Sequence, residues 1–129
     1  MLVLNGNFAM INEAQAAFVA SGAHLTRITG PNATIAFSAP NGSQFGQLEI
    51  DAVGGATFNG DARVAGDVTL GANTSVVGGA NLVSIDGSLI DAVGSRWQVA
   101  LTRFTGADPV IPPQFLGSVE FLAGVGLDG

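Results

Sequence analysis

Few side chains in this sequence are able to carry out nucleophilic or acid–base chemistry. The chain has one histidine, His24, and no cysteine, tyrosine or lysine, so most pairs of a nucleophile with a base cannot be formed. The best remaining acid–base pair is Glu49 with Asp51. Because residues two apart lie on the same face of a β-strand, we expect both carboxylates on a solvated surface. The sequence therefore predicts no catalytic residues and no enzymatic activity.

Asp61, Asp67 and Asn73 recur at intervals of six residues. Stacked one above another, their side-chain oxygens would form a ladder able to bind Ca²⁺. Asp and Asn also stabilise turns by bonding to nearby backbone groups. We expect the turn role, and the sequence therefore predicts neither a metal nor a cofactor.

Two aromatic or basic side chains are candidates for binding. Trp97, between Arg96 and Gln98, could stack on a sugar, which leaves a glycan-binding adhesive module as an alternative function and a host glycan as a possible partner. However, Trp97 lies on the apolar face of a strand that alternates between apolar and polar residues, and this position favours a place in the core. We expect His24 to be a hydrogen-bonded structural residue.

Composition narrows the class of protein. The 129 residues suit one domain; 47% are hydrophobic, only 11% are charged, and the net charge is −6. Such an apolar chain is expected to bury part of its surface against other chains. The four basic residues are all arginines (Arg27, Arg63, Arg96 and Arg103) and are scattered, so nucleic acid is not an expected partner. No apolar stretch approaches the roughly 20 residues of a membrane span, so no membrane association is expected.

Periodicity predicts one helix and several strands. Residues 10–22 favour a short helix with Asn12 as its cap, and Phe18 on its apolar stripe. Residues 33–38 and 47–52 alternate between apolar and polar, as strands with one buried face do. Residues 95–104 predict a longer strand with Trp97, Val99 and Leu101 on one side.

Between these segments, residues 56–85 form five consecutive hexads. Each hexad has a small or β-branched first residue and a small fifth residue, and its third residue is large and apolar. The third residues are Phe58, Val64, Leu70, Val76 and Leu82.

This pattern predicts that each hexad is one edge of a β coil. Two inward residues spaced by two make a short strand, and the small residue with Asp, Asn or Gly turns the corner. At three hexads per coil, five hexads give fewer than two coils, too few for a solenoid standing alone. The missing neighbours would be other copies or the flanking strands, so the five third-position residues are the predicted core of an oligomer.

The run Gly55-Ala-Thr-Phe-Asn-Gly-Asp-Ala-Arg-Val-Ala-Gly-Asp-Val-Thr-Leu-Gly-Ala-Asn resembles the Gly-Asp-punctuated repeats of bacteriophage tail fibres, spikes and head fibre or decoration proteins. The resemblance implies a homotrimer in which three chains wind together or pack short sheets about an axis. Ser84-Ile85-Asp86 is similar to steps in bactofilins, which implies a self-polymerising β-helical filament as an alternative. The spacing of Phe58 and Ala62 is also similar to hexapeptide-repeat acyltransferases, but the only histidine lies outside the repeat.

From these observations we expect a mainly β fold, either β-helix-like or a trimeric β-prism or sandwich, with one short N-terminal helix. The expected regions are an attachment region (1–45), a hexad segment (46–94) and a C-terminal strand with a docking tail (95–129). The expected function is that of a virion structural protein: a trimeric decoration, fibre or spike subunit bound to a capsid or tail protein. Its predicted docking residues are Phe18, Phe115 and Phe121.

Overall fold

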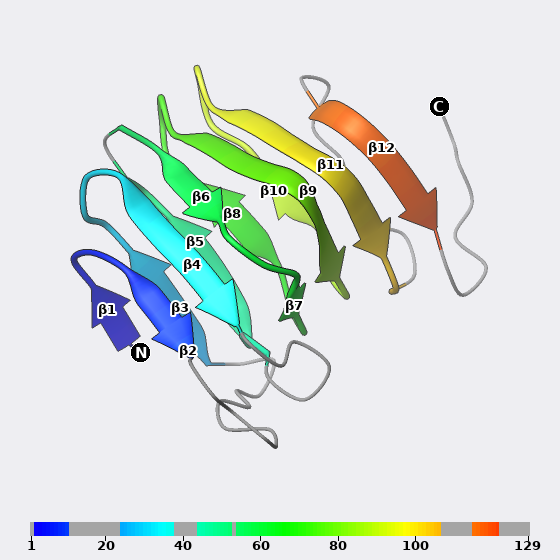
Figure 1. Cartoon of the computed structure of the whole chain (residues 1–129), viewed down its shortest axis with the longest axis horizontal. Coiled ribbons are helices and arrows are strands. Elements are labelled where there is room, and N and C mark those ends of the chain that lie inside the picture. Colours follow the sequence, from blue (N-terminus) through cyan, green and yellow to red (C-terminus); the bar gives the residue numbers. More distant parts are fainter. Residues whose placement is uncertain (1, 11–23, 38–43, 53, 107–114, 122–129) are drawn as a thin grey trace.

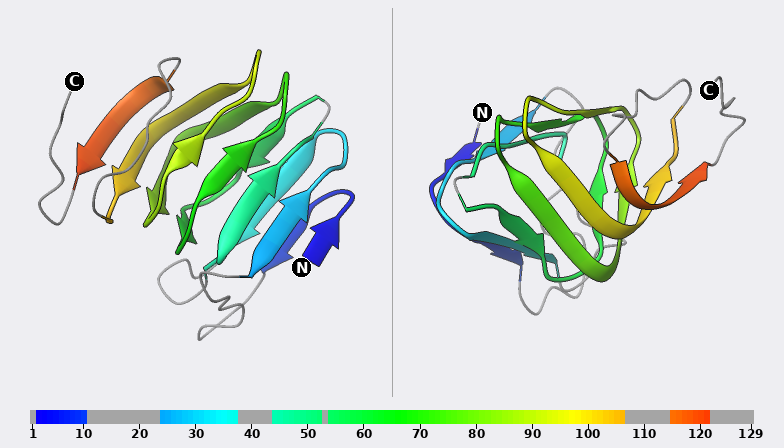
Figure 2. Two further views of the ribbon diagram at one scale, coloured as in Figure 1. Left: turned by 180° about the vertical axis from the view of Figure 1, so that it is seen from behind. Right: turned by 90° about the horizontal axis from the view of Figure 1, so that it is seen from above.

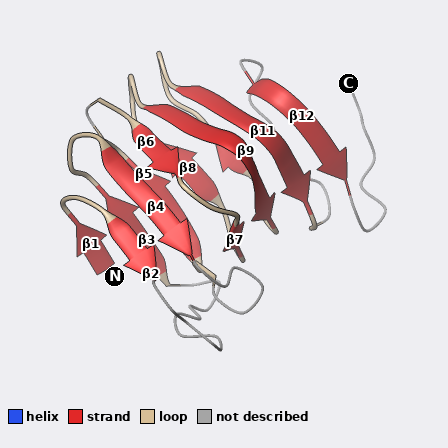
Figure 3. Ribbon diagram, in the orientation of Figure 1, coloured by secondary structure: helices blue, strands red, loops and turns tan. Residues whose placement is uncertain are grey.

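The chain forms a parallel β-solenoid of about four turns (Figure 1). The structure, a computed structural model, describes residues 2–10, 24–37, 44–52, 54–106 and 115–121. These residues form strands and turns and contain no helix (Figure 3). The mainly β prediction is therefore confirmed, and of its variants the β-helix-like one is observed.

In the described part of the chain, twelve strands form two parallel sheets. Sheet A has the order β1-β3-β5-β8-β10, and sheet B has the order β12-β11-β9-β6-β4-β2, with β7 also paired to β9. The strands are β1 (Leu2–Leu4), β2 (Phe8–Met10), β3 (Leu25–Ile28), β4 (Ala33–Phe37), β5 (Gln47–Ile50), β6 (Ala56–Phe58), β7 (Ala62–Val64), β8 (Val68–Leu70), β9 (Ser75–Ile85), β10 (Leu89–Ile90), β11 (Arg96–Phe104) and β12 (Phe115–Phe121).

Residues stack in columns that run along the solenoid axis. The column Leu2, Thr26, Leu48, Val68 and Leu89 crosses all five strands of sheet A, so one coil takes about 20 to 24 residues. This exceeds the eighteen residues that three hexads would supply. Seen from above, the turns of the chain enclose one interior (Figure 2, right).

The first three hexads form three successive sides of one coil, as the sequence predicts. They supply β6, β7 and β8, and in each strand the first and third residues are buried while the second is more exposed. Small corner residues allow the chain to change direction after each three-residue strand. The prediction that each hexad is one edge of a coil is confirmed for this part of the repeat.

The flanking segments supply the stacking neighbours that the five hexads lack, which is one of the two sources that the sequence predicts. Strands β3, β4 and β5 precede the repeat and β10 to β12 follow it, yet all pair in the same two sheets. Stacking neighbours therefore come from one chain, although the flanks lack the hexad spacing. A coil joins the apolar core when its inward residues align with those of the neighbouring coils. This alignment does not require a strict six-residue repeat in the sequence.

The predicted oligomer core lies mostly inside the single chain. Phe58, Val64, Leu70 and Val76 are at most 2% exposed and belong to the central apolar cluster, while Leu82 is half-buried. One chain thus buries four of these side chains without a partner. Their assignment to a core shared between chains stays a prediction.

A bulge explains why Leu82 and Leu101 do not point inward as predicted. The pairing of β9 with β11 shifts register around Val99, and Gly79 in β9 has a φ of 56°. After the shift the buried residues are Val83 and Ile85 in β9 and Thr102 and Phe104 in β11. An added residue in a strand reverses the inward and outward faces, because side chains alternate with period two.

Other sequence-based predictions fall on different parts of the chain. Apart from Met10, which ends β2, the predicted helix over residues 10–22 lies outside the described residues, and so does Phe18. Phe115 and Phe121 begin and end β12. Strands from the first two predicted regions lie in both sheets, and β11 and β12 of the third region lie in sheet B. The division into attachment, repeat and docking regions stays a prediction.

One core position carries a polar group without a partner. Thr26 is fully buried in the inward column of sheet A, and its hydroxyl has no hydrogen bond. We expect Thr26→Val to raise the free energy of unfolding by about 1 kcal/mol, because burial of an unpaired hydroxyl is unfavourable. Chemical denaturation followed by circular dichroism measures the change. Thr102→Val is the matched control: the buried Thr102 hydroxyl accepts a hydrogen bond from Trp97, so this variant should be destabilised.

Candidate functional site

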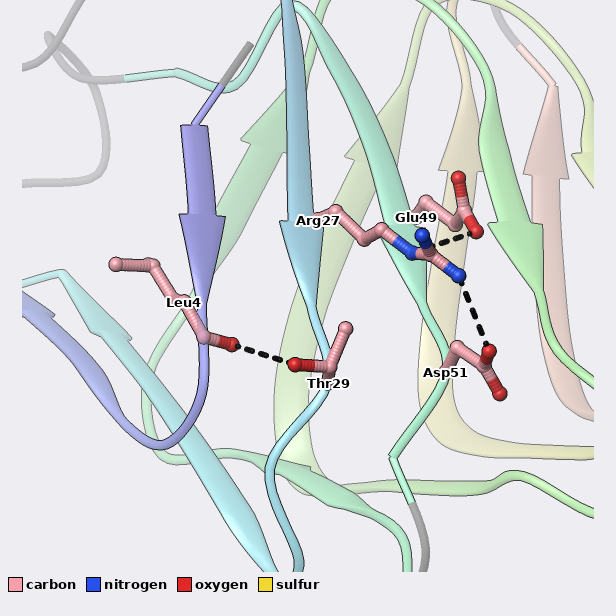
Figure 4. Close-up of polar contacts among 5 residues, drawn as sticks. All are labelled: Leu4, Arg27, Thr29, Glu49 and Asp51. Carbon is pink, nitrogen blue, oxygen red and sulfur yellow. Dashed lines mark hydrogen bonds and ion pairs between the residues drawn. The ribbon is translucent and has the colours of Figure 1, made fainter.

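Two ion pairs among the described residues lie on the outer face of sheet A. Arg27 on β3 contacts Glu49 on β5 and Asp51 just beyond β5, with Nε to Oε1 at 3.1 Å and Nη2 to Oδ2 at 3.4 Å. Figure 4 shows the Arg27 side chain extending across the strands toward both carboxylates. Nearby, the Thr29 hydroxyl donates to the Leu4 carbonyl at 3.4 Å.

This Arg27 cluster ties neighbouring coils together. Arg27 and Glu49 are direct partners in the sheet register, and their side chains are 40% and 28% exposed. The contact to Glu49 is an ion pair without hydrogen-bond alignment, since Arg27 Nε has no hydrogen-bond acceptor. The predicted surface position of Glu49 and Asp51 is confirmed, and both carboxylates face the same guanidinium. Exposed pairs of this kind contribute little to stability.

Asp61, Asp67 and Asn73 do not stack, so they do not form the ladder that was the alternative to a turn role. They lie at three different corners: between β6 and β7, between β7 and β8, and between β8 and β9. Residues six apart occupy successive corners of one coil, and residues that stack are about 20 apart. The described residues contain no group of three or more His, Cys, Asp or Glu side chains able to hold a metal ion.

The corner carboxylates instead cap backbone groups of the next coil. Asp61 Oδ1 accepts from the Leu82 N–H and Asp67 Oδ1 from the Ser88 N–H, each at 2.8 Å. Asn7 does the same for the Thr34 N–H, also at 2.8 Å. A turn role was predicted, but with the residue's own backbone as partner. The partners are 21 to 27 residues distant, because they lie on the next coil, where a corner leaves N–H groups that the neighbouring strand cannot reach.

Asp67 offers a direct test of this capping. Asp67→Ala should lower the free energy of unfolding by about 1–3 kcal/mol, since the partly buried Ser88 N–H loses a charged acceptor. Asp67→Asn keeps an acceptor oxygen at the same place and should lose much less. Equal destabilisation of the two variants in thermal melts would contradict a capping role.

Trp97 is a core residue, as predicted. It is 1% exposed, its ring meets Phe58 edge-on at a centroid distance of 5.8 Å, and its Nε1 donates to Thr102 Oγ1 at 2.8 Å. A ring enclosed in this way cannot present a face to a sugar. The glycan alternative therefore loses the residue on which it depended.

His24 precedes β3 and is half-buried. Its carbonyl accepts a hydrogen bond from the Gln47 N–H at 2.7 Å, which joins two successive coils. The sequence has no second histidine and no cysteine that could act together with His24.

Comparisons with known proteins give no identification. No protein-family model, no curated protein and no solved structure matches the chain. Among the described residues there is also no helix of the length and hydropathy needed to cross a membrane. The function must therefore be proposed from the residues and the geometry.

Proposed function

We propose that this protein is a non-enzymatic structural subunit of a virion, of the decoration, fibre or spike type. In this role the solenoid is a building block that joins other copies as a homotrimer and binds a capsid or tail protein. The hexad repeat and the apolar composition support the proposal. The charged side chains of the Arg27 cluster and of the corners make contacts between coils. Such a structural use of these side chains is consistent with the proposal.

The observation that carries the proposal is an uncharged column on the outer face of sheet B. Thr34, Thr57, Val77 and Gln98 are register partners on β4, β6, β9 and β11. Val77 is 41% exposed, and Thr57 and Gln98 are also exposed. Arg96 stands at the margin of this surface, near the start of β11. Interface centres are depleted of charge, so this uncharged surface suits packing against a second copy.

Sedimentation velocity tests the assembly. At micromolar concentration the chain should sediment as a trimer or as larger assemblies of trimers, and Val77→Lys should weaken formation of the trimer by at least about tenfold, because a charge would be placed in the centre of the interface. Thr69→Lys on the outer face of sheet A is the matched control and should leave the trimer intact. A wild-type chain that stays monomeric would contradict the proposal.

The virion role has its own test. Mass spectrometry of virus particles purified from the source culture should detect this chain in a fixed ratio to the major capsid or tail protein. Its absence from intact particles, with the chain abundant in the cell lysate, would contradict a structural role in the virion.

A further inference from the structure

Each end of the solenoid carries a strand of sheet B whose outer edge no described strand pairs. At the N-terminal end this strand is β2, and at the C-terminal end it is β12. Unpaired strand edges are templates for pairing with another chain. All strand pairs from β2 to β12 are parallel, so these two strands run in the same direction. A second copy shifted along the solenoid axis would therefore place its β2 parallel to β12 of the first copy.

The backbone groups of β2 that face this edge follow from the internal pairing. The Asn59 N–H donates to the Ile35 carbonyl, so Ile35 bonds toward β6, and its neighbour Ala36 bonds toward β2. In a parallel pair, alternate residues of a strand bond to opposite neighbours. Phe8 and Met10 therefore bond to β4, and the N–H and C=O of Ala9 face the free edge.

The backbone groups of β12 that face the free edge follow from its pairing with β11. The Thr105 N–H donates to the Ile85 carbonyl, so Thr105 bonds toward β9, and Phe104 and Thr102 bond toward β12. Their register partners in β12 are Phe121 and Val119. Alternation then leaves the backbone groups of Gly117, Val119 and Phe121 on the free edge.

The two edges are complementary in one register. The column Thr34, Thr57, Val77, Gln98 and Leu116 is continuous across sheet B. Phe8 pairs one residue beyond this column, with Ile35. A second copy in the same register therefore has its Phe8 opposite Gly117 and its Ala9 opposite Ser118. In that position Ala9 bonds between Gly117 and Val119, the two residues whose groups face it.

We propose that a second copy of this chain docks head-to-tail, with its β2 pairing in parallel to β12, so that sheet B continues from one copy into the next. The occupant is a second copy because the chain's own two edges match in direction, bonding pattern and register. The contact joins unlike surfaces, so it extends along the axis without closing. It goes beyond the proposed trimer, which would form side by side on the outer face of sheet B.

Disulfide trapping tests the contact, because the chain has no cysteine of its own. Facing residues of adjacent strands lie about 4.8 Å apart, within the range that a disulfide spans. A mixture of the Ala9→Cys and Ser118→Cys chains should form a disulfide-linked dimer under mild oxidation. Each variant alone should form none, and the double variant should form a ladder of covalent oligomers on a non-reducing gel.

A mixture of Thr69→Cys and Ser118→Cys measures collisional background, since Thr69 lies in the middle of sheet A. A mixed dimer that does not exceed this background overturns the proposal. A dimer formed by either single variant alone also overturns it, because like ends would then meet. If no ladder forms but sedimentation still shows a trimer, the axial contact is disproved and the proposed function is not affected.

A backbone variant gives a second measurement. Ala9→Pro removes the N–H that faces the free edge and, by the pairing of β2 with β4, no hydrogen bond between described strands, so the melting temperature should stay close to that of the wild type. Sedimentation should show axial association weakened about tenfold or more, because the opposing carbonyl loses its donor. Unchanged axial association in a folded Ala9→Pro chain would overturn the proposed pairing.

Discussion

Replacing Trp97 by alanine should lower the free energy of unfolding by about 3–5 kcal/mol, the largest effect expected of any single side chain here. The change opens a cavity beside Phe58 and leaves the buried Thr102 hydroxyl without its donor. A loss of this size is a large part of the 5–15 kcal/mol that typically stabilises a domain. Denaturation should be followed by circular dichroism, because Trp97 is the only tryptophan and its fluorescence is lost in the variant.

Trp97→Phe separates packing from hydrogen bonding. It keeps most of the ring against Phe58 and removes the indole N–H, so its loss should be clearly smaller than that of Trp97→Ala. If both variants kept the stability of the wild type, Trp97 would not lie in the core, and a surface role such as sugar stacking would return.

Gly87→Ala is the second change for which a large effect is expected. An added Cβ would meet the Asp67 carboxylate and would lie 2.6 Å from the Gly66 carbonyl oxygen on the coil below. The Gly87 N–H also bonds to that carbonyl at 3.0 Å, so the two coils cannot separate without losing the bond. We expect a loss of about 1–3 kcal/mol from overpacking, with more if the Asp67 cap of Ser88 is also displaced.

Gly79→Ala is the control for Gly87→Ala. No atom lies within 4 Å of an added Cβ at Gly79, and the only penalty is its φ of 56°, which costs about 1 kcal/mol. Thermal melts should therefore place Gly87→Ala well below Gly79→Ala. The reverse order would mean that the coils do not approach as closely as the structure has them.

The sequence predicted local structure well where the alternation is regular. Residues 56–70 alternate between small or apolar and polar residues, and their three strands follow this pattern. It failed at Leu82 and Leu101, because a bulge reverses the inward and outward faces of a strand. Gly78 followed by Gly79 was the one signal in the sequence, since paired glycines permit such a distortion.

Contacts between coils were harder to predict than the coils themselves. The position of Glu49 and Asp51 on a surface follows from alternation, but their pairing with Arg27 depends on which strands are neighbours. The same is true of Asp67 and Ser88, 21 residues apart. A six-residue repeat suggests stacking at six, whereas three-sided coils stack at about 20, so a ladder of Asp61, Asp67 and Asn73, the alternative to their turn role, does not form.

The central claim is that the coil forms within one chain, with Arg63 on β7 directly beside Ser84 on β9. A chain carrying Arg63→Cys and Ser84→Cys tests it, with Arg63→Cys and Thr69→Cys, six residues apart on different sides of the coil, as the control. We expect the first pair to oxidise rapidly to a disulfide within one chain, as peptide mapping can establish, and the control pair to form none. Disulfides between chains from the first pair, or none at all, would contradict a single-chain solenoid.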